Sequence, residues 1–347
     1  MEQRIGFLRV AQSRVAYAVS GSGPALVFPP PSFGHLDLEL ESEDRRAFFE
    51  ALASRFTLVR YDRLGTGLSD RDRPPETFML EFEVDVLEAL FDELELGRAS
   101  MFGSSYGAVV AAAFAGRRPE RVKRLLLFGA YADAAPLSSP SLVGPLASVL
   151  RADWELGSRL LTAAFLPEAD REQARFNARL RRESTSGEVA AALLELWART
   201  DLRDMLGQVM APTLVLHRRD DPVVPMRLGR ALAALIPEAR FEALVGRWHQ
   251  PWFEDVDAVL RAAGAFLGVT APTQAGTTAS DAEKVDLTVR EREVLALVAE
   301  GLDDTAIARR LVLSSHTVHR HMANIRTRLR QPSRAAAVAL AARHGLI

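Results

Sequence analysis

The chain has 347 residues, a little over two domains at about 150 residues each, and its formal net charge is −2. Hydrophobic residues make up 48% and charged residues 25%, as in a globular protein with a sizeable core. The absence of cysteine excludes disulfides, thiolate metal sites and a cysteine nucleophile. No apolar run approaches the about 20 residues of a membrane span, and the N-terminus lacks signal-peptide features, so we expect a cytoplasmic protein without cofactor or metal.

Strand-like and helical segments alternate over most of the first 267 residues. Strands are predicted at residues 3–10, 13–20, 25–28, 56–62, 99–102, 122–128, 212–217 and 239–244. Helices are predicted at residues 44–54, 76–96, 108–116, 227–236 and 256–267. This order of elements predicts an α/β fold with a doubly wound parallel sheet and helices on both faces.

The alternation stops between residues 131 and 210. This stretch opens with a Pro- and Ser-rich passage and continues with helical segments at residues 154–165, 171–182 and 189–200. We interpret it as a helical cap over the carboxyl edge of the sheet, where open α/β folds bind ligands. Its Leu, Phe and Trp content predicts an apolar ligand pocket beneath it.

Residues 268–284 are rich in Gly, Ala, Thr, Ser and Pro and show no apolar periodicity. We interpret them as a flexible linker, with a long surface loop inside one domain as the alternative. Beyond the linker, residues 285–347 hold ten Arg against six acidic residues, a net charge of +4, which leaves −6 for the rest. An acidic body with a basic end indicates that only the end meets a polyanion.

Residues 103–107, Gly-Ser-Ser-Tyr-Gly, match the pattern G-x-S-x-G and follow a predicted strand. Flanking glycines allow a sharp turn where side chains would collide with the sheet, and they expose the central Ser105 near a helix N-terminus. A serine nucleophile needs a base, and the base needs an orienting acid. Asp221 and His249 each follow a later predicted strand, in the order serine, acid, histidine.

Together with residues 61–70, Tyr-Asp-Arg-Leu-Gly-Thr-Gly-Leu-Ser-Asp, these motifs resemble the α/β-hydrolase fold family. The resemblance implies an α/β-hydrolase-like domain over residues 1–267. It also implies Ser105 as nucleophile, Asp221 as acid and His249 as base. Whether this triad turns over a substrate stays open at this point.

Asp221 is preferred to its neighbour Asp220 because the acid of the family usually lies four residues before a proline, here Pro225. An aspartate before a proline also opens turns, which is the alternative for Asp221. His217 and His35 have no comparable support and are interpreted as structural residues.

The oxyanion hole departs from the family pattern. One donor would be the backbone N–H of Tyr106, after the nucleophile. The other would come from residues 29–35, Pro-Pro-Pro-Ser-Phe-Gly-His, where many hydrolases have His-Gly. Proline has no N–H, so Ser32 or Phe33 must donate. The prolines either hold the loop in a working shape or leave the hole half built, and a half-built hole would bind a ligand but turn it over slowly.

The C-terminal end carries a second set of signals. Thr288 followed by Glu291 is a capping box that opens a helix ending at residue 299, before Gly301. A short helix is predicted at residues 305–311, with Asp303 or Asp304 as its cap. A basic helix at residues 317–329, capped by Ser314 or Ser315, and a last helix at residues 335–343 follow. This arrangement predicts a small all-α helix-turn-helix domain at residues 285–347.

The residues of this end resemble the LuxR-type DNA-binding domain. The matches include Glu293-Val294-Leu295, Glu300-Gly301, Ile307-Ala308, Thr317-Val318, His321 and Asn324-Ile325. The resemblance implies double-stranded DNA as a partner and a homodimer formed through the last helix. The residues expected at DNA are Ser315, His316, Thr317, His319, Arg320, Ala323 and Arg326, with Arg309 and Arg310 on phosphates. His319 and Arg320 occupy base-reading positions of the family, whereas Ala323 cannot donate a hydrogen bond there.

Two functions follow from these signals. The first is a DNA-binding transcription regulator whose hydrolase-like domain senses, and in one version hydrolyses, a small organic ligand. The second is a serine esterase or C–C hydrolase with an appended DNA-binding domain. Residues 287–347 favour the first, because a hydrolase alone has no use for them.

Overall fold

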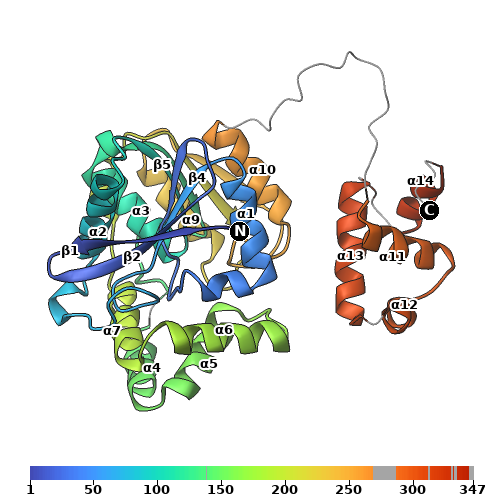
Figure 1. The fold of residues 1–347 in the computed structure, drawn as a ribbon, viewed down its shortest axis with the longest axis horizontal. Helices are drawn as coiled ribbons and strands as arrows, with labels where there is room; N and C mark the ends of the chain where they lie inside the picture. Colours follow the sequence, from blue (N-terminus) through green and yellow to red (C-terminus); the bar gives the residue numbers. More distant parts are fainter. Residues whose placement is uncertain (138, 269–286, 312, 330, 332–333, 344–347) are drawn as a thin grey trace. The chain divides into compact units, whose positions relative to one another are not determined.

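The computed structural model describes residues 1–137, 139–268, 287–311, 313–329, 331 and 334–343 (Figure 1). The chain divides into two compact units, Met1–Thr273 and Gln274–Ile347. The predicted linker lies outside the described residues except for Gly268. No helix in the described part of the chain combines the length and the apolar character that a membrane crossing requires.

The first unit is built on one eight-stranded sheet within the described residues, in the order β1-β2-β4-β3-β5-β6-β7-β8. The strands are β1 (Arg4–Val10), β2 (Ser13–Ser20), β3 (Ala25–Phe28), β4 (Thr57–Tyr61), β5 (Ala99–Ser104), β6 (Val122–Phe128), β7 (Thr213–Arg218) and β8 (Arg240–Leu244). Strands β3 to β8 all pair in parallel. Strands β1 and β2 form an antiparallel hairpin, and β2 pairs antiparallel with β4. The sheet is therefore mostly parallel, and its antiparallel edge arises because a two-residue turn links β1 to β2 and leaves no room for a crossover helix.

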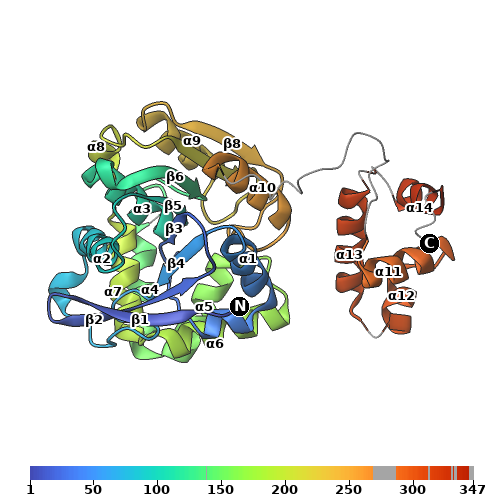
Figure 2. The same cartoon turned by 45° about the horizontal axis from the view of Figure 1, so that its top comes forward.

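Alternating side chains of the central strands form two apolar layers. In β6, Leu125 and Leu127 face one layer and Leu126 and Phe128 face the other. The first layer contains α2 (Leu80–Glu93), α3 (Tyr106–Arg117) and α9 (Met226–Leu235). The second contains α1 (Glu43–Ala53) and α10 (Val256–Leu267). Helices therefore cover both faces of the sheet, as expected (Figure 2).

The insertion between β6 and β7 consists of α4 (Pro140–Ala152), α5 (Trp154–Phe165), α6 (Arg171–Ser184), α7 (Gly187–Ala198) and α8 (Arg203–Leu206). Figure 1 shows α4 to α7 gathered together beside the sheet. Polar caps fix several of these helices: Asp153 accepts the Leu156 N–H at 2.9 Å, and Asp170 forms a capping box with Gln173. Helix α4 lies in the Pro- and Ser-rich part of the insertion, where no helix was predicted.

The second unit contains α11 (Val289–Ala299), α12 (Asp304–Leu311), α13 (Ser315–Arg328) and α14 (Arg334–Arg343). Its capping box is present, since Thr288 and Glu291 bond reciprocally. Asp303 caps α12 and Ser314 caps α13, each through its side-chain oxygen. The apolar core of this unit consists of Leu287, Val294, Leu295, Leu297, Ile307, Ala308, Val318, Met322, Ile325, Leu329, Ala337 and Ala341.

Candidate functional site: a serine at a sharp turn and a helix-turn-helix unit

Ser105 lies at the turn between β5 and α3. Its backbone has φ 52° and ψ −129°, a conformation that a residue with a side chain adopts only when the surrounding structure forces it. The Ser105 N–H donates to the Phe128 carbonyl of the neighbouring strand at 2.9 Å. This strained turn raises the hydroxyl above the edge of the sheet, as expected for a nucleophile elbow.

The two glycines of the motif permit this turn by close backbone contacts. A Cβ on Gly103 would lie 2.4 Å from the Cα of Ala108, inside α3. A Cβ on Gly107 would lie 2.4 Å from the Pro29 carbonyl oxygen. The clashes are therefore with the following helix and with the loop after β3, and not with the sheet as predicted.

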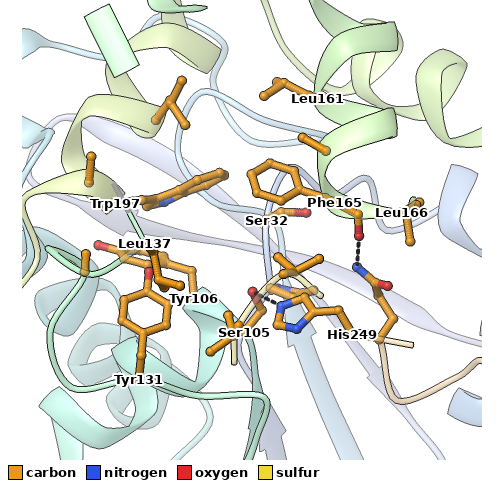
Figure 3. A pocket seen from close by; sticks show the side chains of 18 of the residues that line it. Ser32, Ser105, Tyr106, Tyr131, Leu137, Leu161, Phe165, Leu166, Trp197 and His249 are labelled. Carbon is orange, nitrogen blue, oxygen red and sulfur yellow. Dashed lines mark hydrogen bonds between the residues drawn. The ribbon is translucent and has the colours of Figure 1, made fainter. Parts of the chain in front are cut away.

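The three residues predicted to act together do meet in the structure. His249 Nε2 lies 2.8 Å from Ser105 Oγ, and His249 Nδ1 lies 2.7 Å from Asp221 Oδ2. His249 and Asp221 are 3% and 6% exposed, so the hydrogen bond between them is buried, whereas that between His249 and Ser105 is only partly buried. Figure 3 shows Ser105 and His249 facing each other, joined by a dashed line. A proton can pass from the serine hydroxyl to the imidazole in this arrangement.

The Asp221 carboxylate is firmly held in its charged form. Its Oδ1 accepts the N–H groups of Val223 and Val224 at 2.9 and 3.0 Å. Burial raises the pKa of Asp221, but the charge interaction with His249 and the hydrogen bonds to the carboxylate together bring that pKa well below its usual range. Asp221 therefore remains ionised and can orient the His249 ring.

His217, interpreted from the sequence as structural, touches the same carboxylate. It is fully buried, with Nε2 at 2.7 Å from the Val224 carbonyl and 3.5 Å from Asp221 Oδ2. A carbonyl can only accept, so Nε2 carries the proton in this tautomer. Its place four residues before the acid, at the end of β7, is the sequence signal that could have assigned it to the site.

The loop after β3 borders the serine. Ser32 lines the cavity next to Ser105, while the Phe33 ring is buried and lies 5.0 Å from the Trp197 ring, centroid to centroid. The N–H groups of Ser32, Phe33 and Tyr106 donate no hydrogen bond within the described residues, so they stay available to an oxyanion. The buried Arg63 donates to the Pro30 carbonyl at 3.0 Å, and this bond helps to hold the loop in place.

A cavity of about 340 Å³ lies between the sheet edge and the cap. Figure 3 shows Ser105 and His249 on one side of it and Trp197, Phe165 and Leu161 on the other. Most of the lining is apolar: Pro31, Tyr106, Tyr131, Ala134, Leu137, Leu142, Val143, Leu146, Leu161, Ala164, Phe165, Leu166, Leu194, Trp197, Ala198, Val223, Val224 and Trp252. Such a cavity suits a small, largely apolar organic molecule.

In the second unit, most of the described candidate DNA contacts are exposed. His319, Ala323 and Arg326 on α13 are exposed, as are Arg309 and Arg310 at the end of α12, and Thr317 is half-buried. His319 Nδ1 lies 3.5 Å from Asp304 Oδ2. The side chains of the three other candidates, Ser315, His316 and Arg320, lie outside the described residues.

Comparison with known proteins finds a match in each of the two units. The family model of the alpha/beta hydrolase fold matches residues 24–255, and that of bacterial regulatory proteins of the luxR family matches residues 285–341. The 2-hydroxy-6-oxononadienedioate/2-hydroxy-6-oxononatrienedioate hydrolase of Cupriavidus pinatubonensis is 32% identical over 194 residues, a match that spans 53% of this chain and 66% of that protein.

Two solved structures superpose on the first unit. The enol-lactonase from Burkholderia xenovorans LB400 has a TM-score of 0.64 at 25% identity and covers 76% of this chain and 99% of its own. A hydrolase from Pseudomonas aeruginosa PA01 has a TM-score of 0.63 at 30% identity, with 76% and 98% covered. The predicted fold is thereby confirmed. The chain belongs to the α/β-hydrolase fold family and carries a LuxR-type helix-turn-helix DNA-binding domain in the same polypeptide.

Proposed function

We propose that the protein is a transcription regulator whose hydrolase-like unit binds a small organic ligand and whose C-terminal unit binds DNA. The observation that carries the proposal is a single polypeptide with an apolar cavity of about 340 Å³ in one unit and a LuxR-type domain in the other. A hydrolase alone has no use for a DNA-binding domain, whereas a ligand-controlled regulator needs both parts.

In this proposal α13 enters the major groove of the DNA. Its N-terminal residues would read base edges through His319 and Arg320, and Arg309 and Arg310 would contact phosphates. The exposure of His319, Arg309 and Arg310 supports these roles. Two copies joined through α14 would bind two half-sites, since helix-turn-helix dimers read symmetric operators.

The ligand would lie over Ser105. In a catalytic cycle Ser105 Oγ would attack a carbonyl carbon while His249 takes the hydroxyl proton, and His249 would then return that proton to the leaving group. A water molecule would then attack the acyl carbon while His249 takes a proton from it, and His249 would pass that proton to Ser105 Oγ as the acid product leaves. The ionised Asp221 would stabilise the imidazolium. The Tyr106 N–H and the N–H of Ser32 or Phe33 would bind the oxyanion.

The second candidate function is that of a serine esterase or C–C hydrolase with an appended DNA-binding domain. The continuous hydrogen-bond chain from Asp221 through His249 to Ser105 favours this candidate, because a receptor that only binds its ligand does not require it. The two candidates differ in whether the ligand changes DNA binding.

The test begins by selecting double-stranded DNA from a random pool with the full-length chain. The affinity for the selected DNA is then measured with and without a panel of small esters and lactones. We expect an enriched sequence with two-fold symmetry and an affinity that at least one compound changes. Failure to enrich any sequence over non-specific binding would contradict the regulator.

The catalytic part is tested separately by labelling with a fluorophosphonate probe. The wild-type chain should label at Ser105, and the Ser105→Ala chain should not. A mass spectrum after incubation with the same esters shows whether an acyl group stays on Ser105. An unlabelled wild-type chain that still responds to a compound on DNA would identify the cavity as a receptor without catalysis.

A further inference from the structure

Two arginines line the cavity that the proposed function assigns to the ligand. Arg45 comes from α1 of the body and Arg181 from α6 of the cap. Each is only 5% exposed. Among the described residues neither guanidinium forms an ion pair with a carboxylate, and the described lining contains no Asp or Glu. Buried arginines without a carboxylate partner are unusual, because removing a charge from water is costly unless it is paired.

Neutral groups hold the two guanidinium groups in place. Arg45 Nη2 donates to Asn177 Oδ1 at 2.6 Å, and its guanidinium lies 5.0 Å from the centroid of the Trp252 ring. Arg181 Nη1 donates to Thr162 Oγ1 at 2.9 Å and to the Asn177 carbonyl at 3.2 Å. These contacts fix the orientation of both groups but supply no negative charge.

Several donors remain unused. Arg45 Nε, Arg45 Nη1 and Arg181 Nε are buried and have no hydrogen-bond partner. A buried donor without a partner costs its full desolvation energy, and the cost is larger for a charged group. These donors and the buried charge are the features of an anion-binding site.

The charges around the pair indicate how much negative charge would fit. Burial lowers the pKa of Arg45, and the charges of Glu39 and Asp44 oppose that shift. Burial, and after it the charge of Arg45, lower the pKa of Arg181 to about 9, with no acidic group opposing. Arg181 thus has no acidic neighbour, and one carboxylate in the cavity would supply its counter-charge.

We propose that Arg45 and Arg181 bind the carboxylate of a monoanionic organic ligand whose other end, an ester or a similar carbonyl, lies at Ser105. The proposal deepens the function proposed above, since it names the class of ligand for the same cavity. The guanidinium fork matches a carboxylate geometrically, and its hydrogen bonds strengthen in an apolar, water-poor cavity. Neutral esters would gain none of these bonds.

The test uses half-esters of dicarboxylic acids. Full-length protein with Ser105→Ala, which prevents turnover, is titrated with the monomethyl and the dimethyl esters of glutaric, adipic and suberic acid. Tryptophan fluorescence is the readout, because Trp252 stacks on Arg45. We expect at least one monomethyl ester to bind about tenfold or more tightly than its dimethyl ester.

Further substitutions place the carboxylate. Arg181→Met and Arg45→Met should each abolish the preference for the half-ester. Arg179→Met, on the same helix but half-buried and paired with Glu41, should leave it intact. Without ligand, Arg181→Met should hold or raise the melting temperature, since an apolar side chain replaces an unpaired buried charge. Arg181→Lys, which keeps the charge, should retain part of the preference if Arg181→Met fails to fold.

Several outcomes would overturn the proposal. Equal affinity for half-ester and diester would do so while leaving a ligand-sensing function intact, and so would an absence of binding by every half-ester. A preference that survives both Arg→Met substitutions would place the anion elsewhere. Tighter binding of octyl phosphate than of any half-ester would reassign the site to phosphate. A lower melting temperature in Arg181→Met with an unchanged preference would make Arg181 a purely structural residue.

Discussion

His217 and His249 both point at the same oxygen of Asp221: Oδ2 lies 3.5 Å from His217 Nε2 and 2.7 Å from His249 Nδ1. The His217 ring is closely confined, since a Cβ on Gly229 would lie 2.3 Å from its Nδ1. Its Nε2–H donates to the Val224 carbonyl at 2.7 Å, in the turn that carries Asp221. His217 therefore positions the acid without touching Ser105.

The first prediction concerns this role. His217→Met replaces the imidazole with an apolar side chain of similar length that has no donor, and it should lower the free energy of unfolding by about 1.5–3 kcal/mol. His217→Gln can place an amide nitrogen near the lost Nε2 and should lower it less. Urea unfolding measures both, and fluorophosphonate labelling should slow in the same order. Equal stability of both variants and the wild type would leave His217 without a positioning role.

The second prediction concerns the close approach of α3 to the loop after β3. Gly107→Ala would bring a Cβ within 2.4 Å of the Pro29 carbonyl oxygen, so the loop must shift. We expect a loss of about 1–3 kcal/mol in unfolding free energy, as for overpacked sites, and slower labelling of Ser105. Thermal unfolding and labelling rates measure these effects.

The matched control is Gly144→Ala in α4. A Cβ there meets no atom within 4 Å, and alanine has the higher helix propensity. It should leave labelling unchanged and hold or raise stability. A Gly107→Ala chain as stable and as reactive as this control would show that the contact is not needed.

The third prediction concerns pH. Asp62 is 1% exposed, and one of its oxygens, Oδ2, accepts the N–H groups of both Leu36 and Leu68, at 3.2 and 2.8 Å. Burial raises the pKa of Asp62 from 3.8 to about 7, although these two hydrogen bonds oppose the shift. The folded state thus binds a proton that the unfolded state releases, and this contribution to stability is lost as pH rises from about 4 to about 7.

Asp62→Asn tests this assignment. An asparagine oxygen can accept the same two N–H groups without a charge, so the variant should lack this loss, which amounts to up to about 4 kcal/mol. The difference in unfolding free energy between variant and wild type should therefore grow in favour of the variant as pH rises from 4 to 8. A difference that stays constant with pH would show that Asp62 has an ordinary pKa.

The fourth prediction concerns DNA. Arg309→Ala removes an exposed cation expected at a phosphate, so it should weaken binding to all sequences about equally. The slope of log affinity against log salt should become shallower by about 1. Arg159→Ala in α5, an exposed arginine beside Glu155, is the control and should change neither. Weakening on only one DNA sequence would instead assign Arg309 to base reading.

Local signals predicted some elements closely. The capping box of Thr288 and Glu291 gave the start of α11, since both hydrogen bonds lie within four residues of sequence. Helix α4 was missed because Pro145 lies inside it, where a proline removes a helix hydrogen bond, although its first residue, Pro140, is well suited to a helix start. The predicted helix at residues 76–96 begins later than expected, because Pro75–Thr77 forms a separate 3₁₀ turn before α2.

Some residues of the candidate site could likewise be predicted from the sequence, and others could not. Ser105, Asp221 and His249 could be predicted because each follows a strand, and the carboxyl ends of parallel strands meet at one edge. Arg45 and Arg181 could not, because no sequence pattern links a body helix to a cap helix so far along the chain. Only the folded chain brings both into one cavity, where Arg45 of α1 bonds to Asn177 of α6.

The residue after His249 is tied to the cap. Gln250 Nε2 donates to the Phe165 carbonyl, at the C-terminal end of α5, at a distance of 3.2 Å (Figure 3). A ligand that displaced the end of α5 would stretch or break this bond, which links the cap to the residue next to His249. We therefore expect a ligand too large for the cavity to disturb the position of His249, the proton acceptor of Ser105.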